Sequence, residues 1–323
     1  MTYLVTGATG FIGTNIVEHL AGEGGRVVAL SNVAPSARQK QMAAKASGEV
    51  IFVLGDVRDQ TGLEEIIERH GVERLIHAAV ITSNAEREKT GASLIVDVNL
   101  VGAAAAATAA ANKRLRRFVL VGSVGVFSAY NLPDGMVIEE SQPQRAETLY
   151  GISKSAAERI VRRICSLNGL PYVIGRVATA FGPWEHDSGY RDTLSPLHQI
   201  TRIARADGIA ILRRDRKSNW HYGRDAAAAL VTLAQAESLR YSDYNLGPQW
   251  VWPLGEWCAR LAQRFPNFRY EIGGEGNVEL YSSNDGGFLS GARFTEEFGP
   301  SACFDLDAAF ADFMSWLDEP QTN

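Results

Sequence analysis

The chain has 323 residues, of which 46% are hydrophobic and 21% are charged, and its net charge is −5. This balance is typical of a soluble globular protein long enough for one large domain or two fused lobes. The net charge gives no sign of the basic surface that nucleic-acid binding requires, and the densest basic stretches, at 113–117 and 213–217, are short enough to be solvated helix ends or loops. We therefore expect no nucleic-acid partner.

The three cysteines, Cys165, Cys258 and Cys303, lie far apart, and none has the spacing of a zinc site. We expect three buried free thiols in a reducing compartment and no metal. The N-terminus carries no basic-then-apolar leader, and we expect no apolar run to approach the roughly 18 residues of a membrane span. The sequence therefore predicts a cytoplasmic protein without a membrane partner.

Short apolar runs alternate with helical patterns through the first half of the chain. Strands are predicted at 3–6, 26–31, 50–54, 74–77, 117–121 and 171–176, with a helix at 61–70. The alanine-rich run 102–111 favours another helix, whose small side chains would let a neighbouring helix approach closely. Continuous apolar strands separated by helices predict a doubly wound parallel α/β sheet of the Rossmann type.

The pattern changes after residue 178, where Gly, Pro, Trp and His gather in 181–190. We expect a binding loop over the sheet edge there, followed by helices at 224–236 and 254–264 and a strand at 244–246. The predicted division is a Rossmann domain over 1–178, to which 215–247 returns. A smaller C-terminal lobe would then consist of 179–214 and 248–323.

Three glycines follow the first strand and open a helix. The first permits a tight turn, the second lets the backbone approach a pyrophosphate, and the third allows the helix to pack closely on the strand. Amides at the helix N-terminus would then face the phosphates. This setting predicts a dinucleotide-binding domain, with contacts from Gly7, Thr9, Gly10, Phe11, Ile12 and Gly13.

The end of the second strand distinguishes between dinucleotides. It has Ser31 and Asn32 rather than the acidic residue that usually holds the ribose 2′-hydroxyl of NAD, and Arg38 and Lys40 follow. A hydroxyl with a nearby guanidinium suits a 2′-phosphate, so NADP, or use of both NAD and NADP, is favoured. The alternative is that Arg38 and Lys40 lie on an exposed loop facing water.

Asp56 and Val57, directly after the third strand, are expected to flank the adenine of the cofactor. The carboxylate would accept a hydrogen bond from the adenine amino group, and the valine would pack on the ring. Capping of the helix at 61–70 is a second interpretation of this pair. The two interpretations are compatible.

Tyr150 and Lys154 are four residues apart, so a helix places both side chains on one face. An ammonium there stabilises a phenolate, because a nearby cation lowers the pKa of tyrosine from its ordinary value of about 10. The alternative is a helix-face tyrosine beside a solvated lysine. The glycine turn and the other motifs of the chain favour the chemical interpretation.

Taken together, these motifs resemble the extended short-chain dehydrogenase/reductases, the group that includes nucleotide-sugar epimerases and dehydratases. The resemblance covers the whole chain and implies an NAD(P) cofactor lying on Ala78 and Ala79, and a homodimer formed through helices at 100–112 and 150–167. The matching residues, in chain order, are 6–13, Gly55-Asp56-Val57, His77-Ala78-Ala79, Val98-Asn99-Leu100, Ser123 with Val126-Phe127, Tyr150 with Lys154, 181–183, Asp225 and 244–247.

The resemblance also implies a catalytic set of Ser123, Tyr150 and Lys154. Tyr150 would give or take the hydroxyl proton while a hydride moves between a substrate carbon and the nicotinamide. Lys154 would lower the pKa of the tyrosine and bind the nicotinamide ribose, and Ser123 would hydrogen-bond the reacting oxygen. Asn99 would shape the proton-relay region.

The chain departs from the nucleotide-sugar enzymes where those enzymes hold a diphosphate. Residues 177–179 lack their asparagine, Ser218 stands in place of an arginine with Lys217 beside it, and 284–287 lacks a further arginine. Since these arginines neutralise a diphosphate, we expect a free sugar, a sugar acid or a similar hydroxylated molecule as substrate. A nucleotide-sugar 4-epimerase or dehydratase is the alternative. A non-catalytic cofactor-binding regulator is a second one, although such proteins tend to lose the tyrosine or the lysine.

Candidate substrate contacts carry hydroxyl, indole, guanidinium or imidazole groups near the expected site. For Arg191 the functional interpretation is recognition of a carboxylate or phosphate, and the alternative is an ion pair with Asp187 or Asp192 that stabilises the loop. For His221 the alternative is simple packing or hydrogen bonding. The candidates are Ser83, Ser123, Thr179, Trp184, Arg191, Trp220 and His221.

Overall fold

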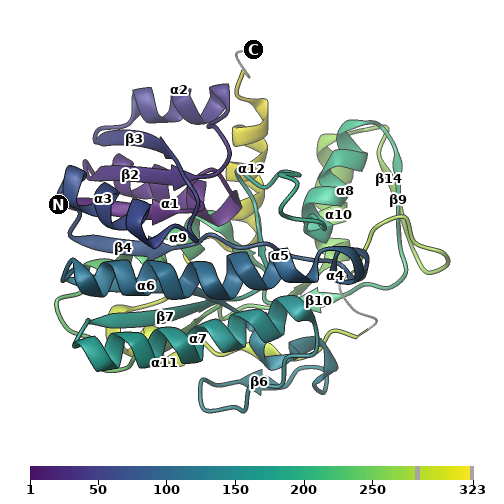
Figure 1. Cartoon of the computed structure of the whole chain (residues 1–323). Helices are drawn as coiled ribbons and strands as arrows, with labels where there is room; N and C mark the ends of the chain where they lie inside the picture. The colour runs from purple at the N-terminus through teal and green to yellow at the C-terminus, as the bar shows by residue number, and fades with distance from the viewer. Residues whose placement is uncertain (281–283, 321–323) are drawn as a thin grey trace.

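A seven-stranded sheet lies at the centre of the protein in a computed structural model that describes residues 1–280 and 284–320 (Figure 1). Its order is β12-β7-β5-β4-β1-β2-β3, and all neighbouring strands are parallel. The doubly wound sheet is confirmed, and each predicted strand lies within two residues of its observed bounds. The strands are β1 (Thr2–Thr6), β2 (Arg26–Ser31), β3 (Glu49–Leu54), β4 (Arg74–His77), β5 (Arg117–Ser123), β7 (Tyr172–Val177) and β12 (Asp243–Leu246).

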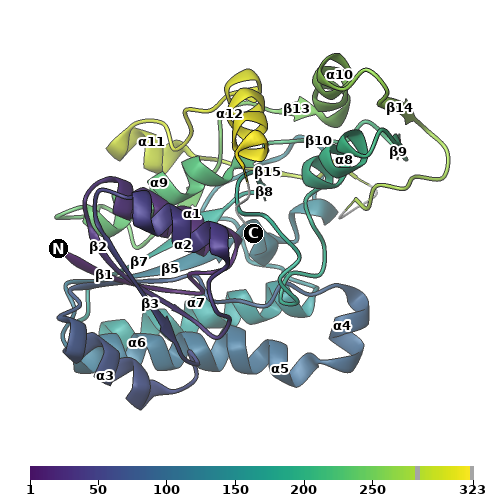
Figure 2. The same ribbon diagram turned by 90° about the horizontal axis from the view of Figure 1, so that it is seen from above.

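Helices cover both faces of this sheet (Figure 2). Side chains alternate along β1, so Tyr3 and Val5 enter one core while Leu4 enters the other. One face is covered by α3 (Gln60–His70), α6 (Gly102–Asn112) and α7 (Leu149–Asn168), and the other by α1 (Phe11–Gly22) and α9 (Gly223–Gln235), with α2 (Ala37–Lys45) beside α1.

One helical rod of the sheet domain is long and apolar enough to cross a membrane by length and composition. It spans 92–112 and joins α5 (Ala92–Val96), a π-helical turn (Asp97–Val101) and α6. The expectation that no apolar run approaches a span is therefore wrong, because the apolar residues before the alanine run continue the same helix. Ala103, Ala106 and Ala110 are fully buried, and α6 packs against α3 and α7. This packing identifies a core helix of the sheet domain.

A second core forms beside the sheet, with Trp257 and Phe313 fully buried in it. Trp220 and Tyr222, from the predicted returning segment 215–247, also enter this core, and the domain boundaries stay a prediction. Its helices are α8 (Pro196–Arg205), α10 (Leu254–Arg264) and α12 (Leu306–Asp318), while α4 (Ala85–Thr90) and α11 (Ala292–Phe298) lie outside it. The short strand pairs are β8 (Ala180–Phe181) with β11 (His221–Tyr222), β9 (Ile209–Leu212) with β14 (Arg269–Ile272), β10 (Lys217–Ser218) with β13 (Trp252–Pro253) and β6 (Val137–Ile138) with β15 (Phe288–Leu289).

The three cysteines do not share one environment. Cys165 of α7 and Cys258 of α10 are buried, as expected, and burial raises the pKa of each thiol to about 12. Cys303 is exposed, so the prediction of three buried thiols is wrong for this residue. It lies on the irregular connection between α11 and α12, at the surface of the protein.

Candidate active site

A cavity of about 1300 Å³ opens where the strands of the sheet end. Residues directly after β1, β2 and β4 line it, including Gly7, Asn32 and Ala78, together with Ser123 at the end of β5. Parallel sheets of this topology bind ligands at that edge. The volume exceeds the roughly 300–1,000 Å³ of a pocket for one small ligand, so two ligands can lie side by side in it.

Most residues predicted for the site line this cavity. They are Gly7, Thr9, Gly10, Phe11, Ile12, Gly13, Ser31, Asn32, Arg38, Asp56, Val57, Ala78, Ala79, Ser83, Ser123, Tyr150, Lys154, Thr179, Trp184 and Arg191. Asn99, Trp220 and His221 are not among its lining residues. The structure therefore brings the two ends of the predicted site, the glycine turn and the Tyr150 helix, into one space.

The glycine turn is packed so closely that two of its positions exclude a side chain. Gly7 has φ +66°, and a Cβ there would lie 2.6 Å from Ala79 Cα. A Cβ on Gly13 would lie 2.0 Å from the Gly7 carbonyl oxygen. Helix α1 starts within this turn, at Phe11, so its first amides belong to the cavity wall at Phe11 and Ile12. Bare backbone beside a helix N-terminus fits the pyrophosphate of a dinucleotide.

Ser123, Tyr150 and Lys154 meet where β5 ends beside α7. Thr148 caps this helix by accepting a hydrogen bond from the Gly151 amide at 3.1 Å, which places Tyr150 in the first turn. Gly125 lies between the two hydroxyl residues. A Cβ on Gly125 would lie 3.2 Å from the ring of Tyr150 and 3.4 Å from the hydroxyl oxygen of Ser123. The two hydroxyl groups therefore share one end of the cavity.

Lys154 is 4% exposed and donates a hydrogen bond of 2.5 Å to the Val121 carbonyl oxygen. Burial lowers the pKa of its ammonium to about 8, and the Glu158 carboxylate one turn further along α7 opposes this shift. Glu158 is itself paired with the buried Arg176 at 2.8 Å. The Glu158–Arg176 pair therefore limits how strongly the carboxylate holds the lysine in its charged form.

Asn99 lies behind the site, within the π-helical turn of the rod. Its amide nitrogen donates to the Ile81 carbonyl oxygen and to the Ser153 hydroxyl, each at 3.0 Å, and its oxygen accepts from the Ile81 amide at 2.7 Å. These bonds connect the segment after β4 to helix α7. Its role in a proton relay stays a prediction, whereas its position supports the helix that carries Tyr150.

Arg38 is held by the C-terminal helix and does not lie on a loop facing water. Its guanidinium donates to the Trp316 carbonyl oxygen, lies 3.3 Å from Glu319 and stacks 3.6 Å above the Trp316 ring. Burial lowers the pKa of Arg38, with Glu319 opposing. The ring of Trp184 also contacts Trp316, and its indole nitrogen donates to Glu18 at 2.9 Å. Neither expectation for Arg38 describes this arrangement.

Asp56 already has a cationic partner at the cavity edge. Arg58 donates to it from the backbone amide and from the guanidinium, with Nη2 2.5 Å from Oδ2. This hydrogen bond holds the pKa of the Asp56 carboxyl below its usual range. Sequence reasoning missed Arg58, although the two-residue spacing is short enough to suggest the pair.

Trp220 lies in the core of the lobe, whereas His221 is buried against the Ser301 carbonyl, and neither lines the cavity. The His221 side chain is fully buried, its Nε2 lies 3.4 Å from the Ser301 carbonyl oxygen, and burial lowers its pKa to about 4. Trp220 donates from its indole nitrogen to the Trp252 carbonyl oxygen at 3.0 Å. Both are packing residues, and the prediction that they contact substrate is not supported by their positions.

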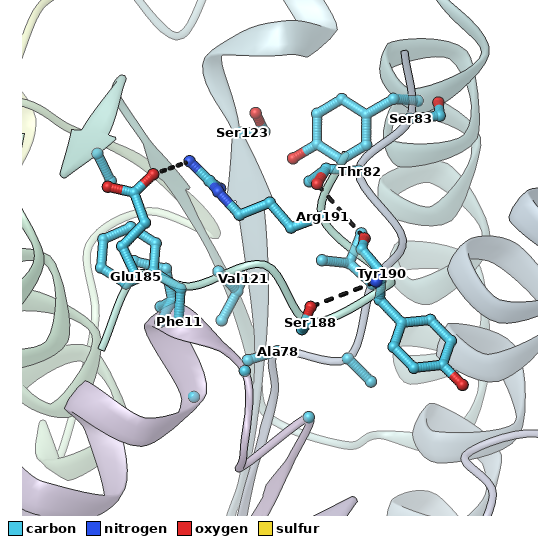
Figure 3. Close-up of a pocket in the computed structure, with 18 of the residues that line it drawn as sticks. Phe11, Ala78, Thr82, Ser83, Val121, Ser123, Glu185, Ser188, Tyr190 and Arg191 are labelled. Carbon is cyan, nitrogen blue, oxygen red and sulfur yellow. Dashed lines mark hydrogen bonds and ion pairs between the residues drawn. The ribbon is translucent and has the colours of Figure 1, made fainter. Parts of the chain in front are cut away.

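Arg191 lines the cavity, but its ion-pair partner is neither of the two aspartates considered from the sequence. Its guanidinium pairs with Glu185 at 2.8 Å, a contact drawn as a dashed line in Figure 3. The Glu185 side chain is fully buried and accepts two further hydrogen bonds of 2.6 Å from the amide and hydroxyl of Ser195. Asp192 instead pairs with Arg87 of α4. Sequence reasoning missed Glu185 because no regular spacing connects it to Arg191.

A smaller cavity of about 580 Å³ adjoins the first, and the two share Glu279 and Leu280 in their walls. Arg213 and Arg214, directly after β9, line it. Arg214 donates to Asp285 at 2.5 Å, and Arg213 is exposed. The sequence indicated only a short solvated basic stretch here, and it gave no sign that these guanidinium groups lie beside the main cavity.

Known proteins resemble the chain over most of its length. The model of the NAD dependent epimerase/dehydratase family matches residues 3–247. dTDP-glucose 4,6-dehydratase 1 of Escherichia coli (strain K12) is 26% identical over 266 residues, which cover 76% of this chain and 72% of that protein. Sterol demethylase protein B of Methylococcus capsulatus (strain Bath) is 33% identical over 187 residues, which cover 57% of this chain and 53% of that protein.

Solved structures share the fold. The UDP-glucose 4-epimerase of Thermus thermophilus in complex with NAD superposes with a TM-score of 0.78 and 21% identity, covering 99% of this chain and 100% of that one. The family match spans well over half of the chain and contains the glycine turn, Ser123, Tyr150 and Lys154. The chain belongs to the NAD-dependent epimerase/dehydratase family of the extended short-chain dehydrogenase/reductases and is an NAD(P)-dependent enzyme.

Proposed function

We propose that the protein interconverts a hydroxyl and a carbonyl on the sugar of a nucleotide sugar, in an NAD-dependent epimerase or dehydratase reaction. The observation that carries this proposal is the meeting of Ser123, Tyr150 and Lys154 at one end of a cavity whose other end is the glycine turn. The dehydratase and the epimerase described above are named for nucleotide-sugar substrates, which supports the same substrate class.

Three side chains of this site divide the proton chemistry between them. Tyr150, as the phenolate, takes the proton of the substrate hydroxyl as the carbonyl forms, and the resulting phenol returns the proton in the reverse direction. The Lys154 ammonium, one turn along α7, stabilises the phenolate. Ser123 donates a hydrogen bond to the same substrate oxygen while charge develops on it. When bound, the nicotinamide cofactor supplies the hydride acceptor and donor.

NAD is the proposed cofactor, in place of the NADP that the sequence favoured. The guanidinium near the end of β2 that was considered for a 2′-phosphate is that of Arg38, and it is engaged by Trp316 and Glu319 of the C-terminal segment. Moving it to a phosphate would give up these contacts. Asn32 gives one amide hydrogen to the Tyr190 hydroxyl and lines the cavity, so its other amide hydrogen and its oxygen can bond an unmodified ribose, and the related solved epimerase contains NAD.

Positively charged side chains beside the main cavity support a substrate that carries a nucleotide. The sequence alone did not predict that these side chains lie there. The free-sugar expectation rested on absent arginines, but Arg213 and Arg214 line the cavity that adjoins the main one. Guanidinium groups bind phosphate oxygens with paired hydrogen bonds. A sugar against Tyr150 would meet hydroxyl, amide and carboxylate groups of Ser83, Glu88, Asn131 and Glu147 in the same wall. The diphosphate and base would extend toward Arg213.

A substrate screen tests the proposal directly. UDP- and dTDP-linked hexoses, free hexoses and sugar acids are incubated with NAD or NADP, with nicotinamide absorbance and chromatographic product analysis as readouts. We expect conversion of a nucleotide sugar with NAD. Arg213→Ala should raise the KM for it about tenfold, while Arg205→Ala, an exposed arginine at the end of α8, should leave KM unchanged. If the protein converted only free sugars, the proposal that its substrate is a nucleotide sugar would be refuted.

A further inference from the structure

Residues 185–192, called the strap here, form part of the wall of the main cavity. The segment leaves β8 and reaches α8, and His186, Asp187, Ser188, Tyr190 and Arg191 all line the cavity. Its two ends are anchored in different ways. Glu185 is bonded to Ser195, and Asp192 is paired with Arg87 of α4.

The middle of the strap bonds to the segments that follow two strands, β2 and β4, which are not neighbours in the sheet. The Asn32 amide group, after β2, donates to the Tyr190 hydroxyl at 2.8 Å. On the other side, Thr82, in the segment after β4, donates from its amide to the Tyr190 carbonyl oxygen at 2.9 Å and forms an isolated parallel bridge with Arg191. Figure 3 shows Tyr190 of the strap beside Thr82 of the segment after β4.

Strand β1 lies between β2 and β4 in the sheet. Tyr190 is bonded to Thr82 through its backbone and to Asn32 through its hydroxyl, so its side chain reaches across the end of β1 from the β4 side to the β2 side. The glycine turn, from Gly7 to Gly13, begins at that end, and its backbone is where a pyrophosphate would lie. The strap thus crosses the part of the cavity assigned to the middle of the dinucleotide.

Arg191 puts a positive charge at this crossing. Its guanidinium carbon lies 5.2 Å from the ring centre of Phe11, the first residue of α1, while Glu185 holds one of its nitrogens at 2.8 Å. A guanidinium presents five donors in a planar fork, so it can hold a carboxylate with one edge and phosphate oxygens with another. Helix N-terminus and guanidinium would then bind the pyrophosphate from two sides.

We propose that the strap is a roof over the cofactor, in which Arg191 binds the pyrophosphate and the Tyr190–Asn32 hydrogen bond keeps the roof closed. The inference rests on the nicotinamide cofactor of the proposed function and adds a property to it. A roofed cofactor leaves slowly compared with turnover, so the hydride taken from a substrate is returned to the same molecule. That behaviour suits a reaction without net oxidation.

Cofactor release tests the roof independently of activity. NADH bound to the full-length protein is displaced with excess ADP-ribose, and its fluorescence gives the release rate. Tyr190→Phe removes the hydroxyl that accepts from Asn32 and should speed release about fivefold. Tyr270→Phe, which removes a phenol from β14 outside the cavity, should release NADH at the wild-type rate.

Substitutions that remove or keep the positive charge of Arg191 test its proposed contact with the pyrophosphate. Arg191→Gln should weaken NADH binding about tenfold and reduce the dependence of Kd on salt, and Arg191→Lys should restore most of the salt dependence. Amide hydrogen exchange in 186–191 should slow when NADH is bound, which is a second readout that needs no variant.

The possible outcomes separate this inference from the proposed function. If the wild-type protein binds NADH but both variants release and bind it like the wild type, the roof is refuted and the proposed function stands. Unchanged hydrogen exchange in 186–191 on binding refutes the roof as well. If the wild-type protein binds neither NADH nor NAD, the roof and the proposed function fail together.

Discussion

The Lys154 ammonium donates a 2.5 Å hydrogen bond to the Val121 carbonyl oxygen and so ties helix α7 to strand β5. Strand β5 ends two residues later at Ser123, and α7 carries Tyr150 in its first turn. One buried side chain thereby fixes the distance between the element that presents the serine and the element that presents the tyrosine. In the proposed reaction the same ammonium stabilises the phenolate.

Replacement of Tyr150 by phenylalanine should remove the acid–base step while leaving the cavity intact. We expect kcat to fall by about 10²- to 10⁴-fold, the range attributed to a positioned proton-transfer group. The Kd for NAD should change little, because the glycine turn and the strap are untouched. Single-turnover measurement of NADH formation, with calorimetric measurement of NAD binding, checks both expectations. Turnover by Tyr150→Phe at the wild-type rate would show that the assigned acid–base group is wrong.

Lys154 should make the stability of the folded protein depend on pH in the alkaline range. Burial lowers its pKa to about 8 in the folded state, whereas lysine in an unfolded chain titrates near about 10.4. Between these values the unfolded chain keeps a proton that the folded chain has lost, so the free energy of unfolding rises with pH. Below about pH 8 both states are protonated and this contribution is constant.

The measurement is urea unfolding of the wild type and of Lys154→Met at about pH 7.5 and about pH 9.5, on either side of the lowered pKa. Every other titrating group is common to both proteins, so the difference between them isolates Lys154. The wild type should gain stability relative to the variant at the higher pH. A difference that is independent of pH would contradict the lowered pKa.

The predicted residues that the structure brings to the cavity are mainly those whose geometry is local. Gly7, Gly10 and Gly13 follow one strand and begin one helix, and Tyr150 and Lys154 are separated by one helical turn, so spacing alone places them. Ser123 was located because a strand end in a parallel sheet has a fixed relation to the cavity. None of these positions depends on how the second lobe folds.

The contacts that the sequence missed join segments far apart along the chain. Arg38 is bonded to Trp316, 278 residues away, and Asn32 to Tyr190, 158 residues away. Composition and periodicity carry no information on which distant side chains meet, so Arg38 was interpreted from its position after β2 alone. His221 was considered a substrate contact for a similar reason, although it is fully buried beside the carbonyl oxygen of Ser301, 80 residues away.

The glycine turn offers a matched pair of substitutions on one helix. Gly13→Ala would place a methyl group 2.0 Å from the Gly7 carbonyl oxygen, so the turn or the helix must shift. We expect a loss of about 1–3 kcal/mol in unfolding free energy and loss of measurable NAD binding. Gly22→Ala, at the other end of α1, meets no described atom within 4 Å and should be neutral or slightly stabilising. Equal NAD affinity in the two variants would refute the assignment of the turn.

Arg38 should matter for stability more than for cofactor choice. Arg38→Gln removes the stacking on Trp316 and the contacts that hold the C-terminal helix, so the free energy of unfolding should fall by about 1–2 kcal/mol. The ratio of Kd values for NADP and NAD should stay within about twofold of the wild type. Lys40→Gln, on the exposed face of α2, is the control and should change neither quantity. A selective loss of NADP affinity in Arg38→Gln would restore the interpretation based on the 2′-phosphate.

A homodimer through the helical face of α5, α6 and α7 stays a prediction, and exposed apolar side chains on those helices support it. Val101 of the π-helical turn before α6, and Ile152 and Ile160 of α7, are 46%, 47% and 36% exposed, and α6 and α7 pack side by side (Figure 1). Light scattering should give twice the chain mass of 35.1 kDa for the wild type. Ile152→Glu should shift the protein toward the monomer, because a charge in an apolar contact is costly to bury. Ile209→Glu, at an equally exposed position on β9 in the other lobe, should not. A wild-type monomer at micromolar concentration, or dissociation by both substitutions, would exclude this face as the interface.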